Sequence, residues 1–167
     1  MPAEELNLWN RDISKESFGE KYNDLLIAQY KLYVASAEKV SDRRNLANTF
    51  FLSIHTFLLG ILGFYVEKMT SLANDWLVLV FLVALLMICA AWWLIVRSYR
   101  QLNTGKFIVI GELEKRLPAS PYWSAEWRVL GEGKDLQKYF PLTHIENYIP
   151  LIFAFIYLTL AIIFYLL

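Results

Sequence analysis

Three stretches of this chain contain no charged residue and are each long enough to cross a lipid bilayer. They are residues 45–66, 76–96 and 147–167. A helix of about 20 apolar residues spans the roughly 30 Å hydrocarbon layer, and an uncharged run of this length is typical of a transmembrane helix. Three such runs in 167 residues leave little sequence for a soluble core. The sequence therefore predicts an all-α integral membrane protein with three transmembrane helices.

The composition agrees with this class. Hydrophobic residues make up 57% of the chain, above the roughly 45–50% of ordinary soluble domains. The 16 basic residues balance the 16 acidic ones, so no net charge favours a nucleic-acid partner. The single cysteine, Cys89, lies within the second run, which excludes an intramolecular disulfide and predicts a small packed side chain.

The orientation in the membrane follows from the basic residues beside the runs. Residues 1–16 contain no apolar segment of a cleavable signal peptide, so the first run is expected to insert by itself. Cytoplasmic loops carry the excess of Lys and Arg, whereas the loop 67–75 holds one Lys against two acids. We therefore expect a cytoplasmic N-terminus and an external C-terminus. The arginines expected at the inner interface are Arg43, Arg44, Arg97 and Arg100.

The segments between the runs predict two cytoplasmic regions and one external loop. Residues 1–16 are expected to be a flexible N-terminus and residues 67–75 an external loop. Residues 17–44 have apolar positions at helical spacing after the capping box of Ser17 and Glu20, which predicts an amphipathic helix. Its apolar face would pack against other cytoplasmic helices or dock on the membrane surface.

Residues 97–146 are expected to combine a helix and a loop in the cytoplasm. The helix continues from the second run as far as Pro118, after which Pro and Gly residues interrupt the sequence. Trp123 and Trp127 are four residues apart and share one face of a helical turn. Beside a membrane, such a pair is typical of an interface anchor.

The first run carries a stripe of small and hydroxylated residues along one face. Successive members are three or four residues apart, so they stay on one side of a helix for the thickness of the bilayer. Such residues form helix–helix contacts in membranes, and three partners are open: the other helices of the same protomer, another protomer, or a water-filled lumen. The stripe consists of Asn45, Thr49, Ser53, Thr56, Gly60 and Gly63.

His55 lies in the same run, about 100° around the helix from Thr56. An ionisable side chain inside a membrane is a candidate functional residue. Two interpretations are open: a neutral histidine hydrogen-bonded to a neighbouring helix, or a group that relays protons or gates a pathway.

No motif of a catalytic, cofactor or metal site occurs in the sequence. It contains no GxSxG elbow, no HExxH helix and no Cys or His pair at metal-ligand spacing. We therefore expect no enzymatic activity, no catalytic residues, no cofactor and no metal.

Several short segments are distinctive when taken together, in their order and spacing. They are residues 29–33, 42–45, 47–48, 50–51, 99–103, 105–107, 126–127 and 141–146. These segments resemble the RipA-like family of small bacterial inner-membrane proteins, which assemble as octamers. A looser similarity links the first half of the chain to SLATT-type membrane effectors. The RipA-like resemblance implies a homo-oligomer in a bacterial inner membrane and implies no reaction.

Two functional classes remain open from the sequence. One is a homo-oligomeric inner-membrane assembly that forms or gates a pathway. The alternative is a membrane-anchored scaffold or regulator that binds a protein partner through its cytoplasmic helices. The expected partners are further copies of the chain and the lipid bilayer, and the alternative adds an unknown cytoplasmic protein. No nucleic-acid partner is expected.

Overall fold

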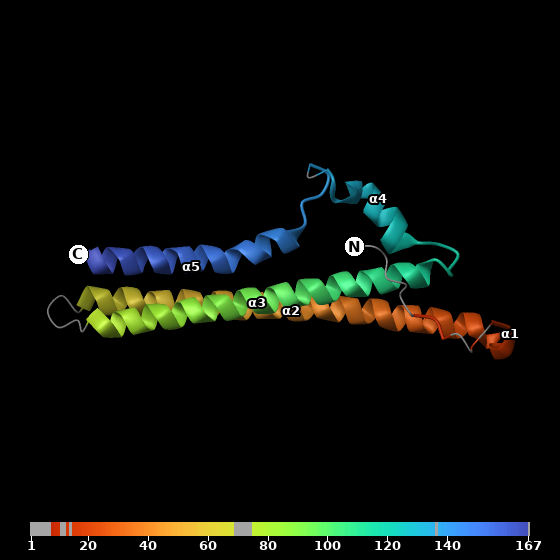
Figure 1. Ribbon diagram of the computed structural model, residues 1–167, viewed down its shortest axis with the longest axis horizontal. Helices are drawn as coiled ribbons and strands as arrows, with labels where there is room; N and C mark the ends of the chain where they lie inside the picture. The colour runs from red at the N-terminus through yellow and green to blue at the C-terminus, as the bar shows by residue number, and fades with distance from the viewer. Residues whose placement is uncertain (1–7, 11–12, 14, 69–74, 136, 167) are drawn as a thin grey trace. The chain divides into compact units, whose positions relative to one another are not determined.

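The described part of the chain is built from helices. The computed structural model describes residues 8–10, 13, 15–68, 75–135 and 137–166, and these ranges contain no strand. The long helices are α2 (Lys21–Lys68), α3 (Asp75–Glu114) and α5 (Leu142–Leu166) (Figure 1). The short ones are α1 (Lys15–Phe18), the π-helix η1 (Pro121–Glu126), α4 (Trp127–Val129) and the 3₁₀-helix η2 (Gly131–Gly133).

Each long helix contains a segment long and apolar enough to cross a membrane. These segments lie within Lys21–Tyr65, Trp76–Glu114 and Ile145–Ile163. The 48 residues of α2 would extend about 72 Å at 1.5 Å per residue, more than twice the hydrocarbon thickness. Its charged N-terminal half therefore continues outside the bilayer. The all-α fold with three helices able to span a membrane is thus confirmed.

The chain divides into two compact units, and both α2 and α3 contribute to each. The membrane unit comprises residues 40–102 and 140–167, and the extramembrane unit comprises residues 1–39 and 103–139. The first contains the three uncharged runs. The second contains 23 of the 32 charged residues of the chain, although the charged residues directly beside the runs belong to the first.

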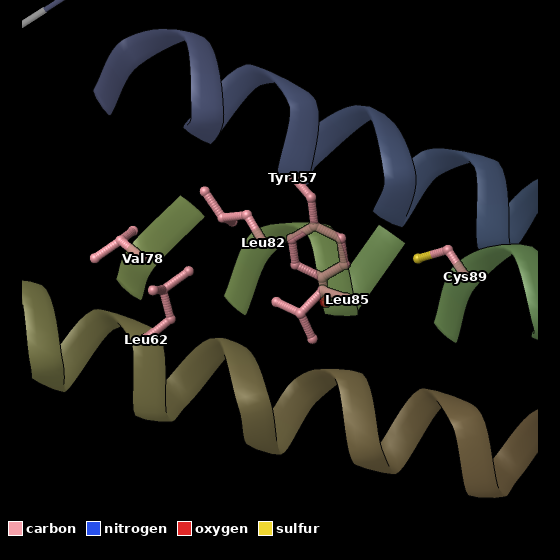
Figure 2. Packing of buried hydrophobic residues seen from close by; sticks show 6 residues of the cluster. All are labelled: Leu62, Val78, Leu82, Leu85, Cys89 and Tyr157. Carbon is pink, nitrogen blue, oxygen red and sulfur yellow. The ribbon is translucent and has the colours of Figure 1, made fainter. Parts of the chain in front are cut away.

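The core of the membrane unit lies between α2, α3 and α5 (Figure 2). Its members are large or medium apolar side chains that are almost fully removed from the surface. Because lipid is as apolar as leucine, close van der Waals packing and hydrogen bonds hold such helices together. The cluster consists of Leu62, Val78, Leu82, Leu85, Cys89 and Tyr157.

In the extramembrane unit, the first part of α2 packs against the last part of α3. Lys106 Nζ donates to Ser36 Oγ at 2.8 Å and lies 4.6 Å from the centroid of the Tyr33 ring. Arg116 Nη1 donates to Tyr22 Oη at 2.9 Å. Partner numbers rise along α3 as they fall along α2, so the two helices are antiparallel. The buried apolar residues here are Leu26, Ala37, Ile110 and Leu113.

Several predicted boundaries differ from the structure. The helix expected over 17–44 is divided near its start, because α1 ends at Phe18, α2 begins at Lys21, and Gly19 between them has a φ of +70°. Glycine adopts this left-handed conformation without steric cost, which interrupts the helix. The helix of the third run begins at Leu142 instead of residue 147, with Pro150 inside it.

Two other predictions fall partly or wholly outside the described residues. Within the expected external loop 67–75, α2 continues to Lys68 and α3 begins at Asp75, and residues 69–74 are not described. Of the expected flexible N-terminus 1–16, only residues 8–10, 13 and 15–16 are described.

The second run and its extension form one helix that ends at Glu114, four residues before Pro118.

Candidate functional site

One face of α2 carries three polar side chains that contact the other two helices of the membrane unit. Arg44, Asn48 and His55 are four and seven residues apart, and Leu62 follows seven residues later. These intervals keep all four on one side of a helix. We call this side the inner face of α2. Each of its polar groups has a partner on α3 or α5.

The first contact on the inner face is an ion pair between α2 and α5. Arg44 Nε lies 2.8 Å from Glu146 Oε2, and the two side chains are only 10% and 17% exposed. The N–H direction does not meet the geometry of an aligned hydrogen bond, so the attraction is chiefly that of opposite charges. Removing one member of such a buried pair leaves the other charge without compensation.

The second contact joins α2 to α3. Trp92 Nε1 donates to Asn48 Oδ1 at 2.9 Å, and the tryptophan is fully buried. Its ring stacks on Phe51 at a centroid distance of 5.6 Å and on His55 at 5.5 Å. A buried indole N–H usually finds an acceptor, and here the Asn48 amide provides it.

His55 is the third contact and touches both other helices. It is fully buried. Its Nδ1 lies 2.8 Å from Tyr157 Oη on α5, and its Nε2 lies 3.7 Å from Cys89 Sγ on α3. This geometry agrees with the interpretation of a histidine hydrogen-bonded to neighbouring helices. The Arg44–Glu146 and His55–Tyr157 pairs are both separated by 102 residues, so α2 and α5 are parallel.

A second buried polar cluster lies in the extramembrane unit around Glu114, the last residue of α3. Its carboxylate accepts hydrogen bonds from the hydroxyls of Tyr30 (2.9 Å) and Ser120 (2.7 Å). It also accepts from the backbone N–H groups of Tyr122 (3.1 Å) and Trp123 (3.0 Å). We call these five residues the Glu114 cluster. The carboxylate thus holds the start of η1 against the end of α3 and against α2.

The donors of this cluster keep Glu114 ionised. Burial alone would raise its pKa, but the four hydrogen bonds favour the charged form and hold the pKa below its ordinary value. The pKa of Tyr30 is raised, first by burial and then by its hydrogen bond to the Glu114 carboxylate. Because the carboxylate pKa is lowered on folding, this contribution to stability is present at neutral pH and is lost as the pH falls through that pKa.

The predicted interface tryptophans each pack on a glycine within the extramembrane unit. A Cβ atom on Gly111 would lie 2.6 Å from the Trp123 ring. One on Gly133 would lie 3.2 Å from the Trp127 ring, and Gly133 also has a φ of +71°. Both tryptophans nevertheless leave 47% of their surface exposed, so their role as interface anchors stays a prediction.

The predicted interface arginines have different surroundings. Arg44 is buried in its ion pair, whereas the adjacent Arg43 is exposed. The guanidinium of Arg97 lies 5.0 Å from the centroid of the Trp93 ring. Arg100 is half-buried. Arg44 therefore joins α2 to α5 within the protomer. The distribution of Lys and Arg beside the runs, which predicted an interface role, did not indicate this contact.

The predicted stripe of α2 lies about 120° around the helix from the inner face and is exposed along its whole length. The hydroxyls of Thr49 and Thr56 donate to the backbone carbonyls of Asn45 and Leu52, at 3.0 and 2.8 Å. Nothing lies within 4 Å of a Cβ atom placed on Gly60. Neither α3 nor α5 covers the stripe within the protomer. The whole stripe is Asn45, Thr49, Ser53, Thr56, Gly60 and Gly63.

The family of this chain follows from comparison with known proteins. Residues 27–167 match the model of the Octameric membrane protein family, 8xMP. The chain belongs to this family. The expected resemblance to small octameric membrane proteins is thereby confirmed. No curated protein and no solved structure matches the chain.

Membership of the Octameric membrane protein family gives the exposed stripe a set of neighbours. An octamer provides each protomer with other copies of α2, so a side chain that is exposed in one protomer can be covered in the assembly. The family name establishes self-association in a membrane and identifies neither a pathway nor another partner.

Several residues of the site were not predicted from the sequence. They are Asn48, Trp92, Glu114, Glu146 and Tyr157. The spacing of Arg44, Asn48 and His55 was a readable signal for a polar face. In the described residues, no group of three or more His, Cys, Asp or Glu side chains could hold a metal ion.

Proposed function

We propose that the octamer forms or gates a pathway across the membrane and carries out no catalysis. The observation that carries this proposal is the stripe of small and polar residues on α2, which neither α3 nor α5 covers. Polar and small side chains are unfavourable as a lipid-facing surface compared with large apolar ones, and they favour close contact with another helix or with water. A closed ring of copies supplies both environments.

The remaining face of α2 supports this assignment. Phe50, Phe57 and Phe64 are seven residues apart and more than half exposed. Their bulky apolar side chains suit contact with lipid tails, and they lie roughly 80° around the helix from the stripe. We infer that the phenylalanines face lipid. The stripe then faces neighbouring copies or the axis of the octamer.

We also propose that the protein resides in a bacterial inner membrane with its N-terminus in the cytoplasm. The support is the clustering of basic residues beside the first and second runs, and the resemblance to inner-membrane proteins. Reporter fusions should be active in the cytoplasm at residue 1 and near Gly131. They should be active outside at Asn74 and after Leu167. A cytoplasmic C-terminus would contradict three crossings.

Gly60→Leu is expected to disrupt the octamer or to abolish ion flux. The added side chain would hold apart two helices that otherwise meet at the glycine. Flux of K⁺ and of a larger organic cation would be measured through the purified protein in vesicles, with native mass spectrometry on the same samples. Ala84→Leu is the matched control, because Ala84 is an exposed small residue of α3 outside the stripe. It should leave both measurements within about twofold of the unchanged protein.

The outcomes separate the two functional classes. If the unchanged octamer carries no flux under any tested condition, the pathway is refuted and a scaffold that binds a cytoplasmic protein becomes the better proposal. If the Gly60→Leu protein keeps both its octamer and its flux, the stripe faces lipid. In that case the assignment of α2 to the protomer interface is wrong.

A further inference from the structure

We propose that His55 is a proton-binding site inside the membrane unit, and that a proton bound there loosens the packing of α5 against α2 and α3. His55 has no exposed surface. Each ring nitrogen faces a polar atom of a different helix, Tyr157 Oη at 2.8 Å and Cys89 Sγ at 3.7 Å. The inference concerns helix packing and does not depend on the proposed pathway.

The surroundings of His55 suit the neutral imidazole. A neutral ring has one nitrogen that donates and one that accepts, and a hydroxyl or thiol can do either. In one tautomer Nδ1 donates to Tyr157 while Cys89 donates to Nε2. In the other tautomer both directions reverse. Either arrangement uses both contacts and turns only one polar hydrogen away from the ring, that of the Tyr157 hydroxyl or that of the Cys89 thiol.

A protonated ring fits the same place less well. Both nitrogens then donate, so Tyr157 and Cys89 must both accept and their own hydrogens turn toward apolar neighbours. Cys89 is the titratable group that faces the ring from α3, and Tyr157 is the one from α5. Neither carries charge near neutral pH. The Arg44–Glu146 pair begins 11 residues away along α2, about 16 Å.

The rings around His55 offset part of the cost of a positive charge. Trp92 stacks on it at a centroid distance of 5.5 Å, and the centroids of Phe153 and Tyr157 lie 5.2 and 5.6 Å away. Aromatic faces attract cations, but they do not replace the hydration that a buried ion loses. An imidazolium is therefore more stable in a looser arrangement that admits water. Acid should shift the helices toward that arrangement, by up to about tenfold per pH unit for one linked proton.

Cys89 provides a probe for this change, because it is the single cysteine of the chain, is buried and faces His55. Its rate of reaction with 4,4′-dithiodipyridine would be measured in the complete protein in vesicles, at about pH 7.5 and about pH 5. The same rates for His55→Asn correct for the reagent's own pH dependence, since asparagine keeps a polar group toward Tyr157 and does not titrate. At each pH, the rate for the unchanged protein is divided by the rate for His55→Asn. This ratio should be at least about fivefold higher at about pH 5 than at about pH 7.5. A ratio that stays constant within twofold overturns the proposal.

A second measurement needs no substitution at His55. The chain has two histidines, so ¹⁵N-histidine labelling of a His144→Gln protein reports on His55 alone. The ring signals should change from the neutral to the protonated pattern between about pH 7 and pH 4. A ring that stays neutral throughout overturns the proposal. Neither measurement uses ion flux, so a failure of the pathway would leave both outcomes interpretable.

Discussion

Arg44→Met should lower the free energy of unfolding of the membrane unit by about 3 kcal/mol, because it leaves the Glu146 carboxylate without its counter-charge. The two side chains are 10% and 17% exposed, so water screens the lost attraction only weakly. The methionine keeps most of the volume of the arginine stem, which separates the charge effect from a packing defect. The expected readout is a lower midpoint of unfolding in a detergent titration.

Two further variants make this result specific. Arg43→Met removes an exposed arginine from the adjacent position and should change stability by less than about 0.5 kcal/mol. Arg44→Met combined with Glu146→Leu removes both charges and should recover most of the loss, since an apolar pair often replaces a buried ion pair at little cost. A double variant as unstable as Arg44→Met alone would show that the ion pair is not the cause.

The long helices were predictable because the polar groups of a backbone in lipid must be hydrogen-bonded within the protein. An uncharged run of about 20 residues must satisfy its own N–H and C=O groups, which only a helix does within one segment. The runs at 45–66, 76–96 and 147–167 therefore placed α2, α3 and α5. The ends of these helices were less predictable. A capping pattern at Ser17 and Glu20 competed with the left-handed Gly19, and the glycine interrupts the helix.

The stripe and the inner face show which part of the site a sequence reveals. Small and hydroxylated residues at helical spacing identify one face of α2 directly. Arg44, Asn48 and His55 also recur at helical spacing, but this second face has only three polar members and was not singled out. Partners such as Glu146 lie 102 residues away. Periodicity within one helix does not determine which residue of another helix it meets.

The Glu114 cluster could not be predicted from helical periodicity either. Among several acidic residues of 97–146, Glu114 has the sequence surroundings of an ordinary solvated carboxylate. Its burial depends on the connection after α3 folding back, so that backbone N–H groups at the start of η1 reach the carboxylate. Gly111 permits this return because the Trp123 ring occupies the space of a side chain.

Glu114→Gln should therefore destabilise the extramembrane unit by about 3 kcal/mol, although it changes a single oxygen to an NH₂ group. A carboxylate accepts all four hydrogen bonds, whereas the amide has one acceptor oxygen and places donors against donors. Trypsin cleavage after Lys115 or Arg116 should become faster, because these residues follow the carboxylate directly. Glu112→Gln is the matched control, since Glu112 forms an ion pair with the exposed Lys115 at the surface. This substitution should cost less than about 0.5 kcal/mol.

A graded series would test whether the carboxylate acts through its hydrogen bonds. Tyr30→Phe removes one donor and leaves three, so it should cost about 1 kcal/mol, less than the loss of the charged acceptor. The pKa of Glu114 is lowered in the folded protein, so the unchanged cluster should hold the connection at the pH where a free glutamate titrates and release it only at more acidic pH. Cleavage by pepsin, which is active in acid, would follow this release. Glu114→Gln should show no such acid transition, because its amide does not titrate. Equal cleavage rates for Glu114→Gln, Glu112→Gln and the unchanged protein would mean that contacts other than these hydrogen bonds hold η1 in place.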